Sequence, residues 1–371
     1  MQTQENEMKD VTIEIIEKLI RTWVDPYLGQ DLVSAGAVKE ISVDQDRIEV
    51  RVVLPYAASG HHADCAKALS GIIEETTPCR KVDIAVSSRI EASAPQGDHS
   101  PLPGIKNILV VASGKGGVGK STTSVNLALA LAAEGASAGI LDADIYGPSQ
   151  PHMLGIKGKP ETPDGKRMEP MEAHGLQAMS IGLLVEEDSP VIWRGPMVTR
   201  ALTQLLTETN WRDLDYLIVD LPPGTGDIPM TLAQQIPISG AVIVTTPQDI
   251  ALLDARKGLR MFEKVNVPVL GLVENMSIHI CSECGHEEPI FGHGGGRRMA
   301  EEYGVKLLGA LPLDMRIREE TDGGHPTVTA DPDGDIAGIY RDIARQISAQ
   351  LVRQATAPDQ VAGPRLVVTE A

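Results

Sequence analysis

From residue 106 onwards, two patterns of apolar residues alternate along the chain. Short runs of apolar and β-branched residues are typical of strands buried on both faces of a sheet, and longer stretches with an apolar residue every three or four positions are typical of helices that cover it. The predicted strands are residues 108–112, 138–141, 176–181, 216–219, 241–245, 269–274 and 306–311. Their alternation with helices predicts an α/β fold with a mostly parallel, doubly wound sheet.

A small α+β unit is predicted to precede this sheet. Apolar residues at helical spacing indicate two helices, the first of which is ended by Asp25-Pro26, and strict alternation of apolar and polar residues indicates a hairpin. The predicted elements, in order, are a helix over 11–23, a hairpin over 38–43 and 47–54, a helix over 62–75 and a strand over 81–86.

Composition and spacing also predict the domain boundaries. The serine, proline and glycine content before residue 105 is that of a linker. Helical spacing over 336–352 allows either a membrane-binding helix or a core helix, and the low aromatic content favours core packing. The predicted divisions are a small α+β domain over 1–90, a linker over 91–104, a large α/β domain over 105–354 and a disordered tail over 355–371.

The overall charge is acidic. Lys and Arg number 33 against 51 Asp and Glu, which gives a formal net charge of -18. This balance argues against a general binder of nucleic acid or of anionic membranes. No apolar run approaches the roughly 18 residues of a membrane span, and the polar start MQTQENEMKD is unlike a signal or transit peptide. We therefore expect a soluble, cytoplasmic protein with no nucleic-acid partner and no stable membrane association.

Residues 106–135 predict a strand, a tight glycine-rich loop and a helix in immediate succession, with the P-loop spacing GxxxxGKS. In such a loop, backbone N–H groups converge on phosphate oxygens at a helix N-terminus, the lysine contacts the β- and γ-phosphates, and the serine hydroxyl ligates Mg²⁺. The predicted nucleotide-binding residues are Gly114, Lys115, Gly116, Gly117, Val118, Gly119, Lys120, Ser121 and Thr122.

Polar residues follow three of the predicted strands, at the edge where parallel sheets bind their ligands. Asp142 and Asp144 suit a site that holds Mg²⁺ and an attacking water, although they also suit a cap for the next turn. Asp220 is the Walker B candidate, and residues 223–227 have the composition of a switch segment that senses the γ-phosphate. Asn275 carries an amide that suits adenine or the stabilisation of a turn.

The chain has four cysteines, of which Cys65 and Cys79 are interpreted as ordinary buried or half-buried side chains. Cys281 and Cys284 have C-x-x-C spacing, which allows zinc, an iron–sulfur cluster or a redox dithiol. A second C-x-x-C for a zinc ribbon is missing, so nitrogen ligands would have to come from nearby histidines, namely His279, His286 and His293. Two subunits that bring their pairs together would supply four thiolates, which suits a [4Fe–4S] cluster.

The glycine-rich loop, with Lys115 directly after its first glycine, resembles the deviant Walker A motif of the MinD/ParA group of ATPases. The resemblance implies an ATP-dependent homodimer in which Lys115 reaches the partner's nucleotide site. It also implies that Asp142 lies near the metal and Asp144 orients the attacking water, so that Lys115, Lys120 and Asp144 are the catalytic residues. In that group, an asparagine at the place of Asn275 pairs with adenine.

Further motifs occur in order over residues 105–350, namely DADIYGPS, WRGPM, PPGTGD and the C-x-x-C pair. Together they resemble the Mrp/ApbC-type iron–sulfur cluster carrier ATPases. This resemblance implies that ATP and Mg²⁺ bind at the P-loop, that Cys281 and Cys284 ligate a [4Fe–4S] cluster at a homodimer interface, and that the cluster passes to apo-proteins. The segment that starts at Val191 is expected near the dimer surface.

The stretch WVDPYLGQDLVSAGAV resembles the small SufT-like domain of iron–sulfur assembly proteins. In that domain a cysteine follows the hairpin early, whereas here Cys65 comes late, so no metal role is assigned to it.

Two other functions compete with the carrier. One is a positioning ATPase of the MinD/ParA kind with a structural zinc at the cysteine pair. The other is a dithiol oxidoreductase, which the sequence disfavours because no cation flanks the pair and the acidic neighbours are expected to raise a thiol pKa. Those neighbours are Glu283, Glu287 and Glu288.

Overall fold

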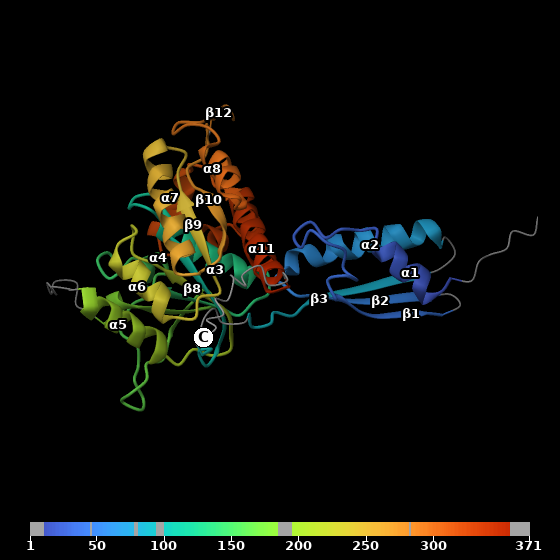
Figure 1. Ribbon diagram of the computed structural model, residues 1–371, viewed down its shortest axis with the longest axis horizontal. Coiled ribbons are helices and arrows are strands. Elements are labelled where there is room, and N and C mark those ends of the chain that lie inside the picture. Colours follow the sequence, from blue (N-terminus) through green and yellow to red (C-terminus); the bar gives the residue numbers. More distant parts are fainter. Residues whose placement is uncertain are drawn as a thin grey trace, which may run out of the picture.

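The computed structural model describes residues 11–44, 47–77, 81–93, 100–184, 195–281 and 283–356. Two main sheets organise these residues, a large one in the body of the molecule and a small one at its side (Figure 1). The predictions for Cys79, for the segment that starts at Val191 up to Arg194, and for the tail beyond Thr356 lie outside the described residues.

Within the described residues, the large sheet has eight strands in the order β13-β10-β9-β4-β8-β5-β7-β6. All neighbouring pairs are parallel except β6 and β7. The strands are β4 (Ile105–Ala112), β5 (Ala138–Asp142), β6 (Met171–Ala173), β7 (Leu176–Ser180), β8 (Leu214–Asp220), β9 (Gly240–Thr245), β10 (Val269–Glu274) and β13 (Leu307–Ala310).

Every strand that the sequence predicts for this sheet is present, so the mostly parallel α/β fold is confirmed. Strand β6 was not predicted. It has only three residues, all half-buried or exposed, and it lies at the edge of the sheet, so it carries no apolar run for sequence analysis to detect.

Successive side chains of β4 pack on opposite faces of the sheet, because side chains alternate along a strand. Leu109 and Val111 belong to the cluster formed with α3, α10 and α11, whereas Ile108 and Val110 belong to the cluster formed with α5, α6, α7 and α8. The helices are α3 (Lys120–Ala133), α4 (Gln150–Met153), α5 (Gly195–Thr207), α6 (Asp227–Gln235), α7 (Asp249–Lys264), α8 (Gly295–Tyr303), α9 (Met315–Asp322), α10 (Thr327–Ala330) and α11 (Asp335–Thr356).

The small sheet has the order β1-β2-β3, with β1 antiparallel and β3 parallel to β2. Its core is closed by α1 and α2 and contains Cys65, whose thiol is fully buried. Burial, together with the charge of Asp25, raises the pKa of Cys65 to about 12. The elements are α1 (Ile13–Ile20), β1 (Val38–Val43), β2 (Arg47–Leu54), α2 (His62–Thr76) and β3 (Lys81–Ser88). Helix α1 is shorter than predicted because the chain turns at Arg21 and Thr22 before reaching Asp25.

Helix α11 packs on both parts of the molecule (Figure 1). Its apolar positions Ile336, Tyr340, Ile343 and Ile347 are buried in the core of the large domain, while Ala349 is buried in the core of the small one. The core-packing interpretation of this helix is therefore confirmed. None of the described helices combines the length and apolarity that a membrane span needs.

The end of α3 contacts both α11 and the small domain. The carboxylate of Glu134, which is 0% exposed, accepts hydrogen bonds from Arg341 Nε at 2.8 Å, Arg345 Nη2 at 2.7 Å and the backbone N–H of Gly60 at 2.8 Å. Burial by itself raises the pKa of this carboxyl, but the donors, Arg345 foremost, outweigh burial and lower it. Helix α3 is thus joined directly to the N-terminal domain.

Candidate functional site

The glycine-rich loop leaves the central strand β4 at Ala112 and enters α3 at Lys120. Gly114 lies so close to α7 that a Cβ atom would come within 2.2 Å of the Asp254 carbonyl carbon. Gly119 has φ +79° and would place a Cβ 2.2 Å from Asn275 Nδ2. These two glycines let the loop pack tightly against the protein.

The opposite side of the loop is open. A Cβ atom on Gly116 or Gly117 would meet nothing within 4 Å. In the described part of the chain, no hydrogen bond is made by the backbone N–H groups of residues 114–119. An open, curved loop with unused N–H groups at a helix N-terminus fits the phosphates of a nucleotide.

Lys120, Ser121 and Asp220 come together beside this loop. Lys120 Nζ lies 2.5 Å from Asp220 Oδ1 and 3.0 Å from Ser121 Oγ, and Asp220 is fully buried. Ser124, one helical turn after Lys120, also donates to Asp220 Oδ1, at 2.8 Å. Hydroxyl and carboxylate oxygens are the donors that Mg²⁺ prefers, so the side chains of Ser121 and Asp220 fit that ion.

Asp142 lies directly beside Asp220, because β5 pairs with β8 at these two residues. Its carboxylate accepts hydrogen bonds from the backbone N–H groups of Asp144, Ser149 and Gln150 and from Ser180 Oγ. Burial and the charge of Asp220 raise its pKa to about 7. Asp142 therefore caps the loop that follows β5, which is one of the two roles that its position in the sequence allowed.

Asp144 is less enclosed than Asp142, with 9% of its surface exposed against 0%. Its Oδ1 accepts from the Gly147 N–H at 3.3 Å. Burial raises the pKa of this carboxyl, and the positive charge of Lys120 partly opposes the effect. Asp144 is thus the carboxylate that remains available near the P-loop, while Asp142 is occupied by its own loop.

The predicted switch segment, residues 223–227, and Asn275 both contact the segment that contains the P-loop. The Gly224 N–H, at φ +95°, donates to Ser113 O at 2.9 Å. Asn275 Nδ2 donates to Val118 O at 2.9 Å, and Asn275 is 7% exposed. Asn275 thus stabilises the P-loop through its backbone at Val118. The pairing of Asn275 with adenine stays a prediction.

Lys115 has a different environment from Lys120. Its backbone carbonyl accepts from Ser113 Oγ, but its ammonium group has neither a hydrogen-bond acceptor nor an ion-pair partner among the described residues. The role of Lys115 in a partner's site stays a prediction.

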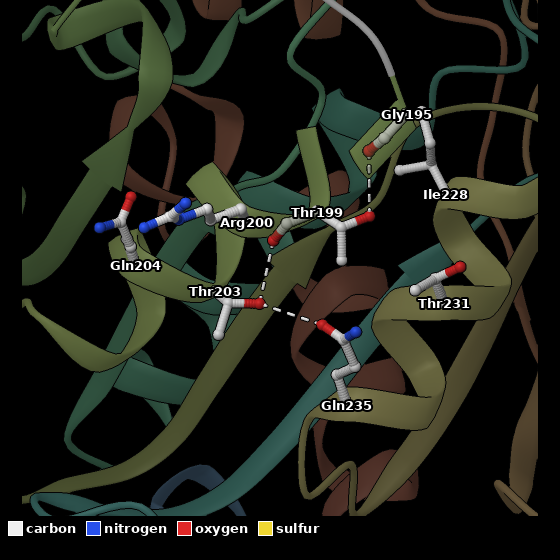
Figure 2. A pocket seen from close by; sticks show the side chains of 8 residues that line it. All are labelled: Gly195, Thr199, Arg200, Thr203, Gln204, Ile228, Thr231 and Gln235. Carbon is white, nitrogen blue, oxygen red and sulfur yellow. Dashed lines mark hydrogen bonds between the residues drawn. The ribbon is translucent and has the colours of Figure 1, made fainter. Parts of the chain in front are cut away.

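A separate cavity of about 690 Å³ lies between α5 and α6 and is lined by none of the P-loop residues (Figure 2). Thr203 Oγ1 spans the gap between the helices and donates to Gln235 Oε1 at 3.3 Å (Figure 2). Arg200, Ile228 and Thr231 also line the cavity. The cavity is therefore formed by α5 and α6 and is distinct from the P-loop.

The cysteine pair lies on a short ribbon formed by β11 (His279–Ile280) and β12 (Glu287–Glu288). The ribbon closes through two backbone hydrogen bonds, from Cys281 N–H to His286 O and from Gly285 N–H to Cys281 O, both at 2.9 Å. Cys281 is half-buried and Cys284 is exposed. The pair therefore faces outwards on a tight turn.

Glu288 raises the pKa of Cys281, as expected from its charge, but the net direction is opposite to the prediction. The pKa of Cys281 is lowered, first by a hydrogen bond from the Glu283 backbone N–H, then by one from the Cys284 backbone N–H and one from the Cys284 side chain. The charge of Glu288 opposes this lowering only weakly. The turn points peptide N–H groups at the sulfur, and they stabilise the thiolate. A thiolate of this kind suits a metal or cluster.

No group of three or more His, Cys, Asp and Glu side chains in the described residues has the arrangement of a metal site. The described residues therefore do not support the option that nearby histidines complete a zinc site around Cys281 and Cys284. The pair presents two ligands, half of what a four-coordinate centre needs.

Sequence reasoning missed two residues of the candidate nucleotide site. Ser124 could have been found from its spacing, since it follows Lys120 by one helical turn. Gln150 donates from Nε2 to Asp220 Oδ2 and to Ser121 O, and no sequence signal marks it because these contacts come from three separate segments.

The parallel sheet, the open glycine loop and the buried Asp220 define a P-loop NTPase. Residues 104–348 match the family model described as ParA, NUBPL iron-transfer P-loop NTPase, and residues 13–86 match that of an iron–sulfur cluster assembly protein domain. The chain belongs to the family of NUBPL/ParA iron-transfer P-loop NTPases.

Known proteins agree with this assignment. The chain is 52% identical over 340 residues to the iron–sulfur cluster carrier protein of Haemophilus influenzae, covering 91% of this chain and 92% of that protein. It is 49% identical over 289 residues to the iron–sulfur cluster transfer protein NUBPL of Mus musculus, covering 77% and 88%. A nucleotide-binding protein of Archaeoglobus fulgidus, solved in complex with ADP, is similar with a TM-score of 0.55 and 37% identity, covering 62% of this chain and 90% of that one.

Proposed function

We propose that this protein is an ATP-hydrolysing iron–sulfur cluster carrier, which holds a [4Fe–4S] cluster between two subunits and transfers it to apo-proteins in the cytoplasm. The observation that carries the proposal is the outward-facing pair of Cys281 and Cys284 on a P-loop NTPase. One pair supplies two thiolates. A second subunit related by a two-fold axis beside the pair supplies the other two that such a cluster requires. The names of the relatives support cluster transfer as the purpose.

ATP is the nucleotide that we propose the protein binds and hydrolyses. On binding, the phosphates take the unused N–H groups of the loop, and Lys120 exchanges Asp220 for the β- and γ-phosphate oxygens. Ser121 and Asp220 would hold Mg²⁺, which neutralises phosphate charge when bound. Asp144 orients the attacking water, whose oxygen bonds to the γ-phosphorus as the bond to the bridging oxygen of ADP breaks.

We propose a homodimer on the basis of the same loop. Lys115 lies in the loop, and in the described chain its ammonium has no partner, so a second subunit's phosphates are a suitable one. A dimer that closes over two nucleotides would also set the distance between the two cysteine pairs. Nucleotide turnover would then alter how firmly the cluster is held.

The alternative is a positioning switch of the MinD/ParA kind with zinc at the cysteine pair. In this case the metal content separates the two functions. A shared [4Fe–4S] cluster gives about two iron atoms per chain, whereas a shared structural zinc gives about half a zinc ion per chain.

The test is anaerobic purification after supply of iron and sulfide, with visible absorption and metal analysis. The wild type and a Cys65→Ala control, which removes a buried thiol away from the ribbon, should both be coloured. The double variant Cys281→Ala, Cys284→Ala should be colourless. Equal colour in the double variant, or zinc alone in the wild type, contradicts the carrier function.

A further inference from the structure

Gln150 contacts both Ser121 and Asp220 in the candidate nucleotide site, although it belongs to neither the P-loop nor the Walker B strand. It is the first residue of the short helix α4, which follows the loop that Asp142 caps, and it is 1% exposed. Its Nε2 donates to Asp220 Oδ2 at 2.9 Å and to Ser121 O at 3.0 Å. One amide therefore joins the Walker B carboxylate to the P-loop helix.

The same residue bridges the two adjacent carboxylates. Its backbone N–H donates to Asp142 Oδ2 at 3.1 Å while its side chain donates to Asp220. Two buried carboxylates one strand apart repel each other, and a neutral donor to each reduces that cost without adding charge. With Lys120 and Ser124 on Oδ1 and Gln150 on Oδ2, both oxygens of Asp220 are held in fixed directions.

The other atom of the amide has no partner. Gln150 Oε1 is buried and accepts no hydrogen bond from any residue that the structure describes. Rotating the amide by half a turn would not remove the problem, because oxygen would then face the Asp220 carboxylate and the Ser121 carbonyl. The unpartnered atom is therefore an acceptor, and a buried acceptor without a donor is costly.

We propose that Gln150 is a positioning residue for the magnesium nucleotide: Nε2 fixes Asp220 relative to Ser121, and Oε1 accepts a hydrogen bond from a water that arrives with the magnesium nucleotide. This inference rests on the nucleotide binding of the proposed function. Asp220 and Ser121 are the side chains that fit Mg²⁺, so a residue bonded to both of their segments sets their spacing. Loss of Gln150 affects metal-assisted binding more than the contacts of the P-loop amides with phosphate.

The experiment measures binding of a non-hydrolysable ATP analogue, adenylyl imidodiphosphate, by calorimetry in Mg²⁺ and in EDTA. Gln150→Met keeps the volume and removes both polar atoms. Loss of a hydrogen bond to an ionised carboxylate predicts binding about tenfold weaker or more in Mg²⁺, with binding in EDTA changed less than about twofold and a higher Mg²⁺ requirement. Gln177→Met is the matched control, because among the described residues the Gln177 side chain bonds only the backbone of Arg212, and it lies outside the site.

The outcomes are distinct. Equal weakening in Mg²⁺ and EDTA assigns Gln150 to packing beneath the P-loop and overturns the inference, as does no weakening at all. If the Met variant does not fold, Gln150→Asn makes the same comparison, since its amide is one methylene too short to reach Asp220 and the same results are expected. Absence of nucleotide binding by the wild type contradicts the proposed function itself.

Discussion

Glu134 ends the helix that starts at the P-loop, and its carboxylate is the point where that helix meets the N-terminal domain. The substitution Glu134→Gln keeps the size and removes the charge. Oε1 of the new amide can still accept from Arg341 and Arg345, but its NH₂ group then faces the Gly60 N–H, donor against donor. The change therefore weakens the ion pairs and breaks the hydrogen bond from the Gly60 N–H, while the backbone hydrogen bond from the Ser59 N–H to Glu134 O remains.

The magnitude follows from burial. Removing one partner of a buried ion pair costs about 3–5 kcal/mol. Glu134 is fully buried, but the side chains of Arg341 and Arg345 are 27% and 15% exposed, so water partly compensates them. We expect the free energy of unfolding to fall by about 3 kcal/mol, near the lower end of that range.

The effect depends on pH in one direction. The folded-state pKa of Glu134 is lowered, so its contribution is fully present above the unfolded pKa of about 4.3 and is lost as the pH falls through the folded pKa. The difference in stability between wild type and variant should be full at pH 7 and shrink below about pH 4.

Urea unfolding of the full chain measures this difference, and hydrogen exchange locates it. Exchange should rise in β2, β3 and the end of α3 more than in β4. Glu172→Gln is the control, since its pair with Arg212 is exposed, at 68% and 53%, and should change stability by less than about 1 kcal/mol. Equal losses in the two variants, or a loss at pH 7 that persists unchanged at low pH, would refute the reasoning.

Two further predictions concern the P-loop. Gly119→Ala should abolish nucleotide binding, because its Cβ would meet Asn275 Nδ2. Gly117→Ala has the same positive φ but open space around its Cβ, so it should only weaken binding. A titration with ADP compares the two variants, and equal effects would contradict the role of Asn275. Lys120→Ala and Lys115→Ala should each stop ATP turnover, and mixed dimers of the two variants should regain part of it; failure of the mixture to regain activity would argue against a role of Lys115 in the partner's site.

The family assignment and most of the strands were accessible from sequence because their signals are local. A buried parallel strand is a run of apolar residues, and the P-loop needs glycines at fixed offsets before Lys120, so neighbouring residues carry the information. The spacing of Cys281 and Cys284 likewise indicates two ligands that share a turn. The pKa of Cys281 was misjudged because counting nearby charges omits the peptide N–H groups that a turn directs at the sulfur.

Tertiary structure decided what distant segments do together. Gln150 and Asp220 are 70 positions apart, and Glu134 and Arg341 are 207 apart. Pairing of β5 with β8 and packing of α11 against α3 create these contacts, and neither leaves a pattern in the residues around them. By itself, the sequence determined that the chain has a P-loop and a pair of closely spaced thiols. The fold determined which side chains hold the Asp220 carboxylate and which ion pairs join the P-loop helix to the N-terminal domain. The reason is that burial strengthens these hydrogen bonds, and the three-dimensional pairing of distant segments selects their partners.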